Sequence, residues 1–100
     1  FFQTVFSWSF TDYGEEYTVF SHAGIDGGFF LSELMSSTAN GACLLVLLSD
    51  DLEATEQRVK ASGGIISQAI FTFPGGRRFH FIEPSGNEFA VWSPLKAYIA

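Results

Sequence analysis

The sequence predicts an α+β fold, because a strand, a helix and three further strands follow one another between residues 42 and 92. Residues 43–48 form an unbroken apolar run, which is typical of a buried strand, and residues 50–62 carry charges at helical spacing. Three runs rich in β-branched and aromatic residues come next, at 65–73, 77–83 and 88–92. Turn-forming residues separate these runs, so we expect a single antiparallel sheet with one helix lying across it.

The expected helix has recognisable ends. Asp50 can accept hydrogen bonds from the first free backbone amides, and Glu53, three residues later, completes a capping box. Leu52 and Val59 are the apolar anchors of its buried face. Gly63 stands where a left-handed residue commonly ends a helix.

The beginning of the chain predicts a partial copy of this arrangement. Residues 1–6 carry Phe at spacings that suit the last turns of an amphipathic helix. Three β-type runs follow, at 8–12, 17–21 and 28–33. This order matches residues 42–92 without the first strand and most of the helix, so we infer an internal structural repeat. We therefore expect a single domain over 1–100, with an incomplete first module in 1–35, a second module in 42–92 and a tail in 93–100.

The amino-acid composition favours some classes of binding partner and cellular compartment over others. With 47% hydrophobic residues, the 100-residue chain can bury one core, and its 12 Phe exceed what we expect a core alone to use, so some should line a cavity or an interface. A net charge of −6 and only five Lys and Arg disfavour nucleic acid and favour neutral or cationic ligands.

The single Cys43, expected as a small buried side chain, predicts no disulfide and fits a reducing compartment. No signal peptide and no spanning apolar run are visible, so we expect a cytoplasmic protein without membrane contact.

Three segments resemble one family. They are FFQTVFSWSF at 1–10, DDLEA at 50–54 before a helix that ends in GlyGly, and FIEPSGNEFAVW at 81–92. The first is similar to a family pattern FYxxVFGWxF, and the last to FxDPxGNxxEL. Together they resemble the vicinal oxygen chelate superfamily, which includes glyoxalase I, extradiol dioxygenases and bleomycin-resistance proteins.

The resemblance implies two βαβββ modules whose mostly antiparallel strands curl into a cup, with the active site on the concave face and a homodimer often completing the cups. The sequence departs from the family pattern at its start, where Ser7 replaces the usual Gly and the first strand is missing. A cup without that strand would expose a sheet edge. We therefore expect a homodimer in which a second copy buries this edge and the apolar tail at 95–99.

The resemblance also locates the metal-ligand positions of the metal-dependent members, which use His, Gln and Glu side chains from four strands. The corresponding positions here fall at Phe30, Leu44 and Ala90, and none of these side chains can coordinate a divalent ion. We therefore expect neither a metal nor another cofactor.

Strand alternation indicates a different binding site. If Phe79 and Phe81 face the helix, then Arg78 and His80 must face the opposite side of the sheet. The next strand adds Glu88 and Trp92 to that side. The expected ligand-binding residues are Arg78, His80, Glu88, Trp92, Phe30, Leu44 and Ala90. The alternative is that Arg78 and Glu88 form only a cross-strand ion pair, with His80 as a partly exposed spacer.

Three functions remain open. The first is a metal-free protein that binds a flat or cationic small molecule on the concave face. The second is a metal-dependent glyoxalase-like lyase, an isomerase or a dioxygenase whose ligands come from sequence upstream or from a partner chain. The third is a fragment without a ligand. No catalytic residue is assigned, because no Ser, His and Asp set has suitable spacing, and His22 is expected to be a solvated turn residue.

Overall fold

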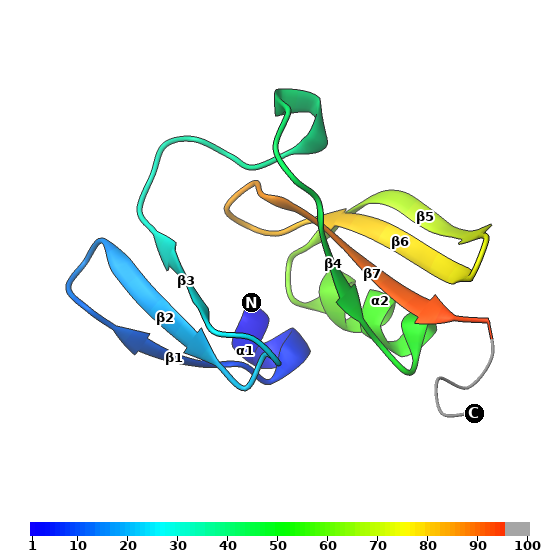
Figure 1. Cartoon of the computed structure of the whole chain (residues 1–100), viewed down its shortest axis with the longest axis horizontal. Helices are drawn as coiled ribbons and strands as arrows, with labels where there is room; N and C mark the ends of the chain where they lie inside the picture. Colours follow the sequence, from blue (N-terminus) through cyan, green and yellow to red (C-terminus); the bar gives the residue numbers. More distant parts are fainter. Residues whose placement is uncertain (96–100) are drawn as a thin grey trace. The chain divides into compact units, whose positions relative to one another are not determined.

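The chain divides into two units, Phe1–Leu34 and Met35–Ala100, in the computed structural model, which describes residues 1–95 (Figure 1). The single-domain organisation over 1–100 stays a prediction. Of the expected tail, residues 93 and 94 belong to the last strand and residues 96–100 lie outside the described residues. Among residues 1–95, no helix has the length and apolar character that a membrane span requires.

The first unit is a short helix followed by a three-stranded antiparallel sheet. Its elements are α1 (Phe2–Phe6), β1 (Ser9–Asp12), β2 (Tyr17–Ser21) and β3 (Gly27–Phe30). The strands lie in the order β1-β2-β3. The expected helix end and three strands are confirmed, although β3 ends earlier than residue 33. Ser7, at the end of α1, has a left-handed φ of 60°, a conformation that Gly adopts more readily than Ser.

Stacked aromatic rings form the interior of the first unit. The ring of Phe2 lies 4.9 Å from Trp8 and 5.4 Å from Phe29, and Trp8 lies 4.7 Å from Phe20. These centroid distances are those of favourable aromatic pairs. The high Phe content of the sequence is therefore partly explained by this cluster.

The second unit contains the complete strand, helix and three-strand order. Its elements are the 3-10 turn η1 (Thr38–Asn40), β4 (Leu45–Leu48), α2 (Leu52–Ala61), β5 (Ile65–Phe73), β6 (Gly76–Ile82) and β7 (Glu88–Pro94). The sheet order is β4-β7-β6-β5. The expectation of a single antiparallel sheet is wrong at β4, which pairs with β7 in parallel. The reason is topological, since an intervening helix and two hairpins return the chain to its original direction at β7.

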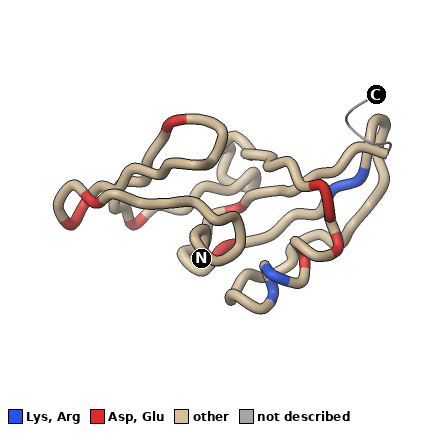
Figure 2. The backbone as a smooth tube through the Cα atoms, turned by 90° about the horizontal axis from the view of Figure 1, so that it is seen from below, with Lys and Arg blue, Asp and Glu red and all other residues tan. Residues whose placement is uncertain are grey.

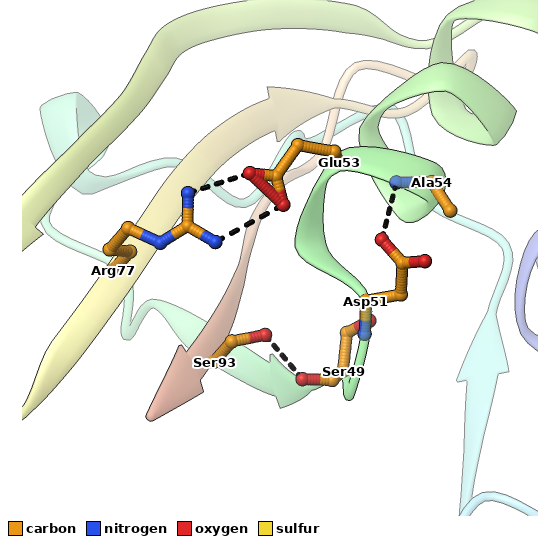
Figure 3. Close-up of polar contacts among 6 residues, drawn as sticks. All are labelled: Ser49, Asp51, Glu53, Ala54, Arg77 and Ser93. Atoms are coloured by element: carbon orange, nitrogen blue, oxygen red, sulfur yellow. Dashed lines mark hydrogen bonds and ion pairs between the residues drawn. The ribbon is translucent and has the colours of Figure 1, made fainter. Parts of the chain in front are cut away.

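Helix α2 begins one residue later than expected. The N-cap is Asp51, whose carboxylate accepts a 3.0 Å hydrogen bond from the Ala54 amide, so the predicted cap at Asp50 is wrong (Figure 3). The side chains of Leu52, Thr55 and Val59 are buried, and their burial determines which face of the helix packs on the sheet and where the helix begins. Gly63 has the expected left-handed φ, at 92°.

Glu53 of α2 therefore does not close a capping box but reaches the sheet. Arg77 of β6 donates to both of its carboxylate oxygens, at 2.7 and 3.1 Å (Figure 3). These hydrogen bonds lower the pKa of Glu53. Phe79 and Phe81 share the face of Arg77 and are completely buried, and α2 packs on this part of the sheet. The prediction that both Phe face the helix is confirmed.

The apolar run at 43–48 behaves differently from a buried strand. The strand starts only at Leu45, and the side chains of Leu45, Val46 and Leu48 are exposed. Cys43 is also exposed, so its predicted burial is wrong. The physical reason is that β4 is an edge strand, which pairs on one side only, and α2 packs on β5, β6 and β7.

Candidate functional site

The face of the second sheet that points away from α2 carries most of the expected site residues. Strand β6 lies between β5 and β7 (Figure 1). In the register of β6 and β7, Arg78 lies opposite Trp92, His80 opposite Ala90, and Ile82 opposite Glu88. Directly opposed residues share a face, so the structure confirms the predicted alternation.

Arg78 lies against two aromatic rings of β5. Its guanidinium carbon is 5.0 Å from the ring centroids of both Phe71 and Phe73, which is within cation–π distance. Its Nε atom is buried and has no hydrogen-bond partner among the described residues. Neither ring was among the predicted site residues, although the alternation of the Phe-Thr-Phe run at 71–73 predicts that they share a face.

His80 is a buried side chain and not a partly exposed spacer. Its residue is only 9% exposed, its Nδ1 lies 3.5 Å from Glu88 Oε2, and its ring centroid lies 5.9 Å from that of Phe71. The other ring nitrogen, Nε2, has no partner within residues 1–95. The expected ion pair of Arg78 with Glu88 is wrong, because Glu88 lies further along β7, opposite Ile82.

Glu88 connects the sheet to the segment that precedes β4. Its Oε1 accepts hydrogen bonds from the backbone amide of Thr38, at 2.7 Å, and from the Thr38 hydroxyl, at 2.8 Å. These bonds, with a smaller contribution from His80, hold the pKa of Glu88 below its usual value. Thr38 was missed in the sequence, where a Ser- and Thr-rich connector has no fixed spacing to a carboxylate on a distant strand.

The remaining expected residues differ in their positions. Trp92 is half-buried, and its ring lies 6.5 Å from that of Phe73. Ala90 is completely buried between the register partners His80 and Val46. Leu44 is half-buried and precedes β4. Phe30 lies in the first unit, where it ends the edge strand β3 and is 75% exposed.

The described residues do not fit the divalent metal of the metal-dependent family members. Phe30, Leu44 and Ala90 offer no coordinating atom, and His80 with Glu88 supplies only a pair of donor side chains. Within residues 1–95, no three His, Cys, Asp or Glu side chains lie close enough together to hold a metal ion. A stable divalent site needs more converging ligands than this pair.

The first unit contains a second polar contact. His22 Nδ1 lies 3.2 Å from the Ser9 hydroxyl and 3.5 Å from the Ser21 hydroxyl. All three residues are exposed, which confirms His22 as a solvated turn residue. An exposed imidazole that contacts two hydroxyls has neither the buried environment nor the orienting carboxylate of a nucleophilic site, so we assign no catalytic role to it.

Charge is distributed unequally between the units. All five Lys and Arg of the sequence lie in Met35–Ala100, whereas Phe1–Leu34 has five acidic residues and no Lys or Arg. In Figure 2 the blue segments accordingly mark only residues of the second unit. The net charge of −6 is therefore carried mainly by the first unit, and Arg78 lies in the unit that is almost neutral.

Comparisons with solved structures support one fold. A glyoxalase/bleomycin resistance protein/dioxygenase family enzyme from Burkholderia phytofirmans PsJN matches with a TM-score of 0.74 and 14% identity, over 94% of this chain and 85% of that chain. A fosfomycin resistance protein from Listeria monocytogenes matches with a TM-score of 0.72 and 15% identity, over 92% and 77% of the respective chains. An antibiotic binding protein from Streptomyces sp. CB03234 matches with a TM-score of 0.65 and 19% identity, over 94% and 81%. At such identities the likeness shows the fold alone.

The sequence comparisons identify the family. None of the curated protein sequences matches the chain significantly. The family model described as Glyoxalase/Bleomycin resistance protein/Dioxygenase superfamily matches residues 1–91. This match covers the first unit and most of the second, and the chain therefore belongs to the glyoxalase/bleomycin resistance protein/dioxygenase superfamily.

Proposed function

We propose that this protein binds a small molecule without a metal, on the sheet face that carries Arg78, His80, Glu88 and Trp92. The observation that carries the proposal is the arrangement of Arg78, whose guanidinium lies against two aromatic rings and whose buried Nε has no partner among the described residues. A buried donor without an acceptor is costly, and a bound ligand can supply the acceptor.

The surroundings of Arg78 favour a flat ligand. Phe71, Phe73 and Trp92 supply aromatic rings on one face, and aromatic side chains with a few polar groups are typical of small-molecule sites. Two of the solved proteins with this fold are described as a fosfomycin resistance protein and an antibiotic binding protein. Both descriptions support a small-molecule ligand for this chain as well.

The binding test compares two adjacent arginines. Flat aromatic compounds are titrated into the isotope-labelled protein, and chemical-shift changes are followed by NMR. We expect changes on the face of Arg78 that are lost in Arg78→Gln and kept in Arg77→Gln, because Arg77 lies on the opposite face and contacts Glu53. Equal loss in both variants, or changes confined to other surfaces, would argue against this site.

The metal-dependent lyase, isomerase or dioxygenase is the alternative function. It requires ligands from outside the described residues, since Phe30, Leu44 and Ala90 cannot coordinate. Elemental analysis of protein purified without chelator separates the two functions. We expect no stoichiometric Zn, Ni, Mn or Fe, and one equivalent of any of them would overturn the metal-free assignment.

A homodimer is the proposed assembly. The edge strand β4 exposes Leu45, Val46 and Leu48, and an apolar edge with unpaired backbone groups favours pairing with another chain. Light scattering should give about twice the chain mass of 11.0 kDa, and Leu48→Glu should lower it towards the monomer. A monomeric mass that does not change with concentration would contradict this assembly.

A cytoplasmic location is consistent with the cysteine content. The sequence has one cysteine, Cys43, which is exposed and free. Oxidising compartments favour paired cysteines, whereas a reducing one keeps a single thiol unmodified. Fractionation of the source cells should place the protein in the cytoplasm, and recovery from the secreted fraction would refute this.

A further inference from the structure

Two nitrogen atoms on β6 lack a hydrogen-bond partner among residues 1–95. They are Arg78 Nε and His80 Nε2, and both are buried. Arg78 and His80 are two positions apart on one strand, so their side chains lie on the same face, with α-carbons about 7 Å apart. A buried donor without an acceptor destabilises the folded state, and a ligand that supplies the acceptor recovers this free energy.

One ring lies beside both side chains. Phe71 is 5.0 Å from the Arg78 guanidinium carbon and 5.9 Å from the centroid of His80. It is half-buried, and it belongs to the edge strand β5, whose pairing with β6 is irregular between Gln68 and Phe71. Turning this ring about its side-chain torsions breaks no backbone hydrogen bond of the sheet, so the ring can move while β5 stays paired with β6.

The charges beside the two nitrogen atoms favour an anion. Arg78 forms no ion pair with a carboxylate that the structure describes. Glu88 is the acidic neighbour of His80, but one of its oxygens is already occupied by Thr38. Nδ1 of His80 faces Glu88, so Nε2 is the ring nitrogen left for a ligand, and it can donate when it carries the hydrogen. Arg78 is a cation without an ionic partner among the described residues, and an anionic ligand would supply one.

We propose that the ligand is an aromatic carboxylate, whose oxygens accept hydrogen bonds from Arg78 Nε and His80 Nε2 after Phe71 has turned aside. The inference rests on the proposed function, since it requires that this face binds a small molecule. It reverses the expectation from the net charge of −6, because the acidic excess lies mainly in the other unit. The positive charge of the Arg78 guanidinium repels a cationic ligand.

The test uses three probes of one shape, namely benzoate, benzamide and benzylammonium, titrated into the full chain and followed by NMR. Benzoate should shift the Arg78 Nε–H and His80 ring signals and bind at least about tenfold more tightly than the other two probes, as charge-assisted hydrogen bonds are the stronger ones.

Substitutions distinguish the contributions of Arg78 and His80 to binding from that of the Phe71 ring beside them. Arg78→Gln and His80→Phe should each weaken benzoate by about tenfold, Arg77→Gln should change nothing, and Phe71→Ala should strengthen binding because no ring has to move. If none of the probes shifts a signal on this face, the proposed function fails and the inference fails with it. If benzamide or benzylammonium binds there as tightly as benzoate, the face binds small molecules but the proposed preference for a carboxylate is refuted.

Discussion

The two units repeat one order of elements, a helix and three antiparallel strands, but they differ in what the sheet carries. In the first unit, the rings of Phe2, Trp8, Phe20 and Phe29 stack on one another. In the second, the rings of Phe79 and Phe81 pack beneath α2, and the opposite face carries a buried polar cluster. The comparison teaches that the same backbone order can hold a mainly aromatic core in one unit, whereas the buried polar groups without partners in the other unit point to binding.

The largest expected effect lies in the core of the second unit. Phe81→Ala removes a fully buried ring and should lower the free energy of unfolding by about 3 to 5 kcal/mol. Trp8 and Trp92 are the only tryptophans, one in each unit, so 5-fluorotryptophan NMR in denaturant follows each unit separately. The Trp92 signal should move most, and Phe30→Ala, at an exposed position, is the control. Equal shifts of both signals would mean that the units unfold as one.

The first unit should respond somewhat less to the same change. Phe20→Ala removes a ring that is 9% exposed, and the expected loss is about 3 kcal/mol, at the lower end for such substitutions. The fluorine signal of Trp8 should report it, because the two rings stack at 4.7 Å. A loss below about 1 kcal/mol would show that the ring stack does not stabilise this unit.

Acid should loosen the polar cluster of the second unit only. The pKa of Glu88 is lowered by its bonds to Thr38, so this carboxylate contributes stability above its unfolded pKa. That contribution disappears as the pH falls through the folded pKa. The protection factor of the Thr38 amide against hydrogen exchange should therefore fall in acid, and Glu88→Gln should remove this acid dependence and cost about 1 kcal/mol at neutral pH. A fall of the same size in the variant would assign the effect to other groups.

The smallest effect is a gain in the first unit. Ser7 is left-handed, with a φ of 60°, and Gly adopts this conformation without strain. Ser7→Gly should raise the free energy of unfolding by about 0.5 kcal/mol, which is the strain relieved less the entropy that Gly loses on folding. Ser62→Gly is the matched control, because Ser62 ends α2 at a φ of −98°. A gain in the control instead of Ser7→Gly would contradict the strain argument.

The sequence by itself determined the elements and the orientation of their side chains. Turn residues and hydrophobic periodicity are local properties, and they located the helices and strands to within a few residues. Alternation along β6 then assigned Arg78 and His80 to one face and Phe79 and Phe81 to the other. The helix cap at Asp51 was missed by one residue, because Asp50 and Asp51 both suit a cap and only burial of the helix face selects between them.

Only the tertiary structure decided which residues meet across the chain. Glu88 contacts Thr38, 50 residues away in the sequence, and Arg78 lies against Phe71 and Phe73 instead of pairing with Glu88. Likewise, the run at 43–48 is as apolar as a buried strand, yet its position at the sheet edge leaves it exposed. Local patterns determine which face a side chain occupies, but strand order and register determine its neighbours, and these depend on the packing of the whole unit.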